Sequence, residues 1–144
     1  MSEKIISVER VFKADKKVVW RAITEKDLMK LWYFDLQDFK TVIGFKFEFM
    51  GGPEDGIQYK HLCQITEVLP EKKLTYSWKY EGFEGVSYVT FELFDEDENT
   101  KVILTHIGFD TFPSSNPDFA IANFEEGWNH IINTSLKAFL EKNI

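Results

Sequence analysis

Hydrophobic and polar residues alternate along much of the chain, which is the pattern of β-strands with one buried face. The alternation is clearest at residues 44–50, where Phe45, Phe47 and Phe49 fall on one face. Further strands are predicted within residues 4–15, 57–70, 74–80, 86–94 and 101–109. The last five strands are separated by short turns, and short connections join antiparallel neighbours. The pattern therefore predicts one antiparallel sheet of six strands.

Helical spacing of apolar residues replaces the alternation after the first strand and again near the C-terminus. Two short helices are predicted after the first strand, with Asp15 and Thr24 as their N-caps. A long helix is predicted from about Pro117, which suits the first helical position, with Asn116 as its N-cap and Asp118 favourable in its first turn.

The last helix is the only predicted element large enough to cover the apolar face of the sheet. We therefore predict an α+β helix-grip fold, in which a curved six-stranded antiparallel sheet wraps around the long C-terminal helix. The two short helices lie at one end. A chain of 144 residues with no repeat, linker or low-complexity segment suits a single domain, residues 1–144.

Composition narrows the function classes. The net charge of −7 argues against nucleic acid and against an anionic membrane surface as partners. Cys63 is the only cysteine, which rules out an intrachain disulfide and a cysteine-based metal motif. No signal-peptide pattern or membrane-length apolar run is present, so a cytoplasmic location is expected. The aromatic content of 16% is high and indicates either an aromatic core or an aromatic-lined chamber.

Candidate chemistry is sparse. His61, His106 and His130 lack metal-ligand spacing, so no metal site is predicted. No nucleophile elbow or catalytic triad context occurs, so we assign no catalytic residue and no cofactor. Cys63 is expected to be a free buried thiol. His106 continues the inward register of Val102, and is either a buried neutral histidine or a polar contact for a ligand.

The segment VFKADKKVVWRAITEKDLMKLW (residues 11–32) resembles the opening of START-like (SRPBCC) domains. ITEVLPEKKLTYSW, VTFELFDEDENTKVILTH and the GWN of the last helix resemble, in order and spacing, the activator of heat shock protein 90 ATPase homologue family. The resemblance implies the helix-grip fold and a deep cavity between sheet and last helix, used in relatives to hold apolar or aromatic molecules. Eukaryotic activators carry a separate N-terminal domain, for which this chain has no room.

The resemblance also bears on Gly127, which lies inside the last helix, where a bend is expected. Gly127 resembles a position where the helix backbone approaches its surroundings closely, with Trp128 turned inward. Side chains on faces assigned inward, or on the loop before the helix, form the candidate ligand-binding set. The set is Trp32, Phe47, Tyr59, Trp78, Tyr80, Phe91, His106, Phe112, Phe119 and Trp128. Core packing is the alternative role, but the polar atoms of Tyr and Trp need partners when buried, which favours a lined pocket.

The loop GFDTFPSSNPDF (residues 108–119) carries three phenylalanines amid Pro, Ser and Asn. We expect it to cover one mouth of the cavity, with Phe112 as the plug. The alternative is that Phe112 only caps the core.

Three functions remain open. The first is non-catalytic binding of a small hydrophobic or aromatic molecule. The second is a regulatory or stress-response interaction protein related to the chaperone-ATPase activators, with a chaperone or other protein as partner. The third is an enzyme of the cyclase or aromatase kind. A cavity favours the first, a filled core with an exposed apolar patch favours the second, and a paired acid and base inside the pocket is needed for the third.

Overall fold

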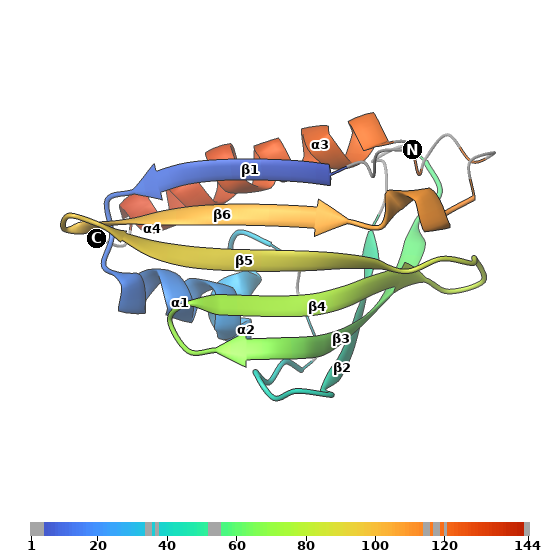
Figure 1. Cartoon of the computed structure of the whole chain (residues 1–144), viewed down its shortest axis with the longest axis horizontal. Coiled ribbons are helices and arrows are strands. Elements are labelled where there is room, and N and C mark those ends of the chain that lie inside the picture. Colours follow the sequence, from blue (N-terminus) through green and yellow to red (C-terminus); the bar gives the residue numbers. More distant parts are fainter. Residues whose placement is uncertain are drawn as a thin grey trace.

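A computed structural model describes residues 5–33, 36, 38–51, 56–113, 116, 119 and 121–142 (Figure 1). The chain begins with strand β1 (Ile5–Phe12) and helices α1 (Lys16–Thr24) and α2 (Lys26–Met29). Strands β2 (Lys46–Gly51), β3 (Tyr59–Leu69), β4 (Lys73–Tyr80), β5 (Ser87–Glu96) and β6 (Asn99–Ile107) follow. The last part contains a short 3-10 helix η1 (Phe109–Thr111), helix α3 (Ile121–His130), the π-helical segment η3 (Ile131–Leu136) and helix α4 (Lys137–Lys142).

The six strands form one sheet in the order β1-β6-β5-β4-β3-β2, and every pair is antiparallel. Strands β2 to β6 each lie beside the strand that follows them in the chain, as their short turns require. Strand β1 pairs with β6 from the other end of the chain, with Val8 opposite Leu104. This confirms the predicted sheet.

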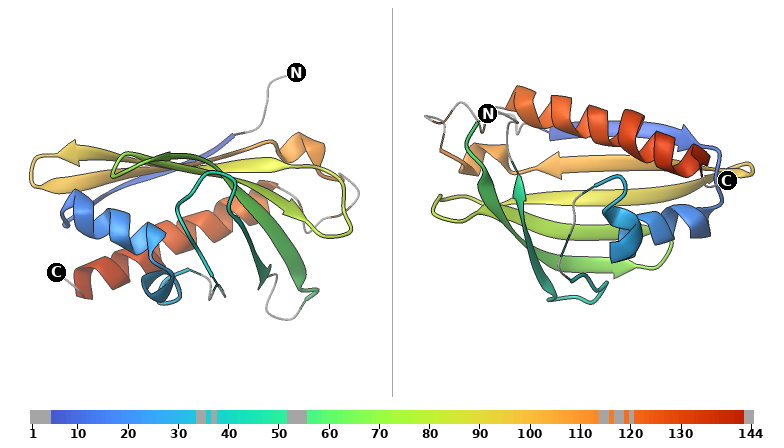
Figure 2. Two further views of the ribbon diagram at one scale, coloured as in Figure 1. Left: turned by 90° about the horizontal axis from the view of Figure 1, so that it is seen from below. Right: turned by 180° about the vertical axis from the view of Figure 1, so that it is seen from behind.

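The last helix and the two short helices lie on the same side of the sheet, and β2 and β3 curve toward them (Figure 2). The last helix runs beside β1, while α1 and α2 cover the opposite part of this face. The arrangement is the predicted helix grip.

Alternation along the strands decides which side chains enter the core. Four residues of β4 are buried, with at most 5% of the surface of each exposed to solvent: Leu74, Tyr76, Trp78 and Tyr80. The same rule buries every second residue of β2, β5 and β6, including His106 at 0% exposure. The predicted inward faces of these strands are therefore correct.

The helix starts are partly as predicted. Asp15 caps α1, and its carboxylate accepts a hydrogen bond of 2.9 Å from the Lys17 amide. Thr24 does not cap the second helix, because its hydroxyl donates to the Trp20 carbonyl of the preceding helix (2.6 Å). Glu25 occupies the N-cap position of α2 instead, without a side-chain hydrogen bond. The predicted start of the last helix at Pro117 and Asp118 lies outside the described residues.

The expectation for Gly127 is wrong. Gly127 is exposed, and a Cβ added to it would meet no atom within 4 Å. The described irregularity of the helix is the π-helical segment η3, which begins four residues later. The glycine therefore serves no close approach of the helix backbone within the described structure.

We predict that Gly127→Ala raises the free energy of unfolding by about 0.5–1 kcal/mol, because alanine is the better helix former at an open helical position. Urea denaturation measures the change.

Gly85→Ala is the matched control. Gly85 has a φ of +104°, and an added Cβ would collide with the Thr111 carbonyl, so this variant should lose more than about 1 kcal/mol. A loss of stability in Gly127→Ala as well would mean that some segment does approach the helix at this point.

Candidate functional site

The ten candidate side chains are all buried, and their rings meet in one network between sheet and last helix. Trp128 is central to it, with ring centroids 5.7 Å from Trp78 and 6.2 Å from Phe91. Tyr33, outside the predicted set, stacks between Trp32 (5.2 Å) and Trp128 (6.0 Å). From Phe91 the network continues through Tyr76 to Phe47. From Trp78 it continues through Tyr80 to Tyr59, Phe112 and Phe119. The structure thus brings the predicted residues together, and their rings pack directly against one another.

A chain of buried hydrogen bonds crosses the centre of this network. The Trp128 indole donates to His106 Nδ1 (2.9 Å), and His106 Nε2 lies 2.7 Å from Ser87 Oγ. Ser87 Oγ in turn donates to the Trp78 carbonyl (3.0 Å). An indole N–H can only donate, so His106 Nδ1 must accept and its proton must reside on Nε2. The four residues therefore form one directed chain from α3 across β6 and β5 to β4.

The direction of these hydrogen bonds determines whether His106 can activate Ser87 as a nucleophile. A histidine that activates a serine must accept the hydroxyl proton on the nitrogen facing it. Here Nε2 carries a proton and donates to Ser87, while the Ser87 proton is directed to the Trp78 carbonyl. In this arrangement the pair is a structural link and not a nucleophile with its base.

Burial keeps two histidines neutral. It lowers the pKa of His106 from its ordinary value of 6.5 to about 3. It lowers the pKa of His61 to about 4, against the opposite effect of hydrogen bonds with the backbone of Tyr59 and Phe49. The His61 ring also stacks on Phe49 at 4.5 Å. Of the two readings left open for His106, the neutral buried histidine matches the structure.

The polar atoms of the aromatic residues find partners inside the protein. Trp32 donates to the Ala22 carbonyl (2.9 Å), and Trp78 donates to the Tyr80 hydroxyl (2.9 Å). The hydroxyls of Tyr33 and Tyr76 share a hydrogen bond of 2.6 Å. Across the described residues, no buried side-chain nitrogen or oxygen is left without a partner. The number of Tyr and Trp residues is thus accounted for without a ligand.

Phe119 occupies a slot built from aromatic rings at one end of the network. It stacks on Tyr80 at 4.6 Å and 21°, and its centroid lies 5.1 Å from Phe83 and 5.2 Å from Tyr59. Phe112, the predicted plug, lies behind it at 5.6 Å. Both rings come from the connection between β6 and the last helix. Residues 114, 115, 117, 118 and 120 of this connection lie outside the described residues, so its predicted role as a cover stays a prediction.

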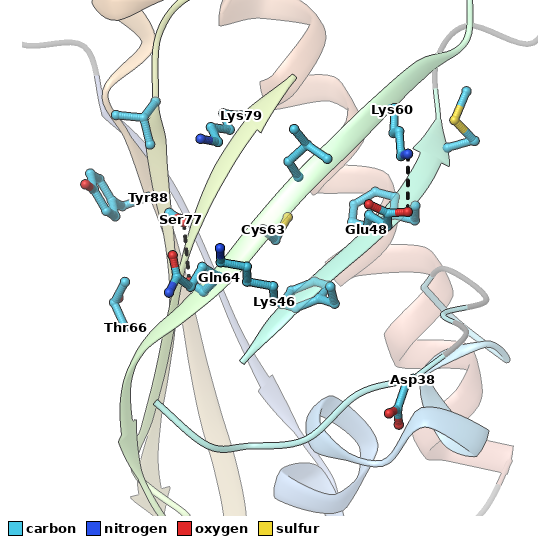
Figure 3. Close-up of a pocket in the computed structure, with 15 residues that line it drawn as sticks. Asp38, Lys46, Glu48, Lys60, Cys63, Gln64, Thr66, Ser77, Lys79 and Tyr88 are labelled. Carbon is cyan, nitrogen blue, oxygen red and sulfur yellow. Dashed lines mark hydrogen bonds and ion pairs between the residues drawn. The ribbon is translucent and has the colours of Figure 1, made fainter. Parts of the chain in front are cut away.

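Two hollows stand out in the described part of the chain, and both open to solvent. The smaller one, about 300 Å³, lies beside the Phe119 slot. Its lining comprises Met50, Ile57, Gln58, Tyr59, Lys60, Glu81, Phe83 and Asn116. The larger one, about 960 Å³, lies on the outer face of the sheet, turned away from the last helix (Figure 3).

Several residues of this region were not predicted from the sequence. Ser87 and Asn116 are polar residues whose roles depend on the long-range positions of His106 and Tyr59, with which they form hydrogen bonds. Phe83 was assigned to a turn, yet its ring, 40% exposed, forms one wall of the slot. In the sequence, the one signal available was a phenylalanine within a short predicted turn.

The remaining candidates for chemistry are accounted for by burial and spacing. Cys63 is a buried free thiol, as predicted, and burial raises its pKa. No group of three His, Cys, Asp or Glu residues within the described ranges is placed to hold a metal ion. No helix that the structure describes combines the length and apolar character needed to cross a bilayer.

Comparisons with known proteins agree with the fold. The family model described as Activator of Hsp90 ATPase homolog 1-like protein matches residues 13–141, in line with the resemblance found in the sequence. No curated protein gives a significant match.

Several solved structures are similar over nearly the whole chain. The Mll3558 protein of Rhizobium loti has a TM-score of 0.82 and 18% identity, covering 96% of this chain and 98% of that one. MLL2253 of Mesorhizobium loti has a TM-score of 0.78 and 26% identity, covering 98% and 99%. CalU16 of Micromonospora echinospora has a TM-score of 0.75 and 23% identity, covering 96% and 76%.

The buried histidines predict how stability depends on pH. The unfolded chain binds protons on His61 and His106 as the pH falls below about 6.5, whereas the folded protein does not until about pH 4 and 3. The contribution of the two histidines to the free energy of unfolding is therefore fully present above pH 6.5 and is lost on acidification. For each histidine, the free energy of unfolding falls with a slope that approaches about 1.4 kcal/mol per pH unit. Urea denaturation between pH 7 and pH 5 measures this slope.

In His106→Gln, the amide can still accept from Trp128 and donate to Ser87, so the slope should fall by about half. His130→Gln, at an exposed position, is the control and should leave it unchanged. An undiminished slope in His106→Gln, or equal stability of the natural chain at pH 7 and pH 5, would contradict the assignment.

Proposed function

The chain belongs to the Activator of Hsp90 ATPase homolog 1-like family, and on this basis we propose that it binds a small apolar or aromatic molecule between its sheet and last helix. Binding involves no catalysis and no cofactor. The proposed site lies at the Phe119 end of the aromatic network, where the ligand takes the place of the Phe119 ring.

The position of Phe119 is the observation that supports this proposal most. Its ring is stacked on Tyr80 and flanked by Tyr59 and Phe83, so the slot already holds one aromatic group. Tyr59 and Phe83 also line the open hollow of about 300 Å³. A planar molecule in that hollow needs only to displace one ring to gain the same stacking contacts.

The chemistry of the slot favours ligands without strong polar groups. The Tyr80 hydroxyl accepts from Trp78, and the Tyr59 hydroxyl accepts from Asn116 (3.3 Å). Ligand groups that compete for these atoms would leave buried partners unsatisfied, at about 1–3 kcal/mol each. Ring faces are what the slot offers, so aromatic and apolar molecules bind best.

The other predicted residues form the deeper part of the proposed site. Phe112 lies against Tyr80 and Phe119, while Trp78, His106 and Trp128 make up the hydrogen-bonded centre behind them. Trp32, Phe47 and Phe91 complete its far wall. We assign these residues to shaping the chamber and only the Phe119 end to exchange with a ligand.

A regulatory interaction protein is the second candidate, and two observations favour it. Aromatic rings pack against one another throughout the predicted site. Three large apolar side chains, Met50, Ile57 and Phe83, are exposed by 57%, 65% and 40% around the smaller hollow. This alternative expects those side chains to contact a protein surface and expects no saturable binding of small apolar molecules.

Titration with the neutral fluorophore N-phenylnaphthylamine separates the two candidates. We expect saturable binding to the natural chain. In Phe119→Ala the slot is vacated, so affinity should rise by about tenfold. In Tyr80→Ala one stacking partner is lost, so affinity should fall by about threefold to tenfold.

Phe94→Ala is the matched control, because Phe94 is 41% exposed on β5 and points away from the slot. It should bind like the natural chain. The proposal fails if no variant binds the fluorophore, or if Phe119→Ala and Phe94→Ala bind it equally although both are folded by circular dichroism.

A further inference from the structure

We propose that the hollow on the outer face of the sheet is a docking site for an extended, acidic segment of a partner protein, with Lys46 and Lys79 binding its carboxylates. This hollow lies on the face of the sheet opposite to the slot around Phe119, and side chains of β2, β3, β4 and β5 line it (Figure 3). It shares Met50 and Lys60 with the smaller hollow, whereas Lys46 and Lys79 line only the larger one.

The strand register brings these side chains together. One row across the sheet comprises Lys46, Gln64, Ser77 and Tyr88, and the next comprises Glu48, Leu62 and Lys79. They alternate with buried residues such as Phe47 and Trp78, so they point away from the last helix. The Lys46 side chain lies across β3 beside Gln64 (Figure 3).

The charges in the hollow differ from those of the chain as a whole. The chain carries a net charge of −7, yet three lysines line the hollow. Lys60 is paired with Glu48 (3.3 Å) and Glu81 (3.6 Å). Lys46 and Lys79 form no ion pair with any residue that the structure describes. Asp38 and Glu48 also line the hollow, so its lining carries three positive and two negative charges. The excess is positive, and the two lysines without an ion pair complement acidic groups.

The shape of the hollow favours an extended segment over a small anion. Lys46 and Lys79 lie two strands and one row apart, which places their Cα atoms about 12 Å from each other. In an extended peptide, residues four apart are separated by about 13 Å and face the same side. Leu62 lies on β3, between the strands of the two lysines, and offers apolar contact to the peptide residue midway between the two acidic ones. A volume of about 960 Å³ that is open to solvent accommodates such a chain without enclosing it.

A short synthetic peptide tests this inference. The probe is a capped heptapeptide, Thr-Glu-Thr-Leu-Thr-Glu-Thr, and the control peptide has lysine in place of both glutamates. Amide NMR shifts of the natural chain are followed during titration at low salt. We expect the acidic peptide alone to shift the amides of Gln64, Ser77 and Tyr88, with weaker binding as salt is added.

The double variant Lys46→Glu/Lys79→Glu should weaken this binding by at least tenfold. Lys13→Glu/Lys17→Glu makes the same charge change at exposed positions elsewhere and should leave it unchanged. Binding of N-phenylnaphthylamine should be the same in both variants, so this test is independent of the proposed ligand site.

Three results would overturn the inference. One is equal binding of the acidic peptide to both double variants. Another is an equal response to the lysine peptide. The third is that acetate, at matched carboxylate concentration, reproduces the same amide shifts, which would mean that the lysines attract any small anion.

Discussion

The hydrogen-bond chain through His106 is the constraint on which the interior depends. It joins α3, β6, β5 and β4, which meet only in the folded protein, and each group in it has one role to fulfil. A buried polar group that loses its partner costs about 1–3 kcal/mol, so no single member can be removed cheaply. The position of Trp128 against Trp78 and Phe91 follows from this link, and with it the depth at which the last helix lies on the sheet.

The Phe119 end of the interior is built differently. Phe112 and Phe119 are held by ring contacts, and neither side chain can form a hydrogen bond. Ring contacts are less directional than hydrogen bonds, so a different aromatic group can replace one of these rings without leaving a polar atom unsatisfied. The contrast between a hydrogen-bonded centre and an exchangeable end is what makes ligand binding compatible with a well-packed interior.

The strands and the inward faces could be predicted because alternation has a period of two and each strand has one buried face. His106 was placed correctly for that reason alone. The role of Ser87 could not be predicted, since it depends on the pairing of β5 with both β4 and β6. The prediction for Gly127 was wrong because a glycine within a helix indicates a close approach only when another segment is near, and spacing along one helix does not reveal that.

The count of Tyr and Trp residues suggested a ligand, whereas the hydrogen-bond partners of their polar atoms proved to be carbonyls and side chains within the chain. The hollow on the outer face depends on which side chains of neighbouring strands the register brings together, and alternation within one strand does not reveal that.

The central claim is that a ligand exchanges with Phe119 while the His106 link stays intact. NMR of the natural chain with bound N-phenylnaphthylamine tests both halves in one experiment. The account predicts nuclear Overhauser contacts from the fluorophore to the rings of Tyr59, Tyr80 and Phe83, with the His106 ring nitrogens unchanged and the proton still on Nε2. Contacts confined to the outer face of the sheet, or loss of the Nε2–H form of His106 on binding, would contradict it.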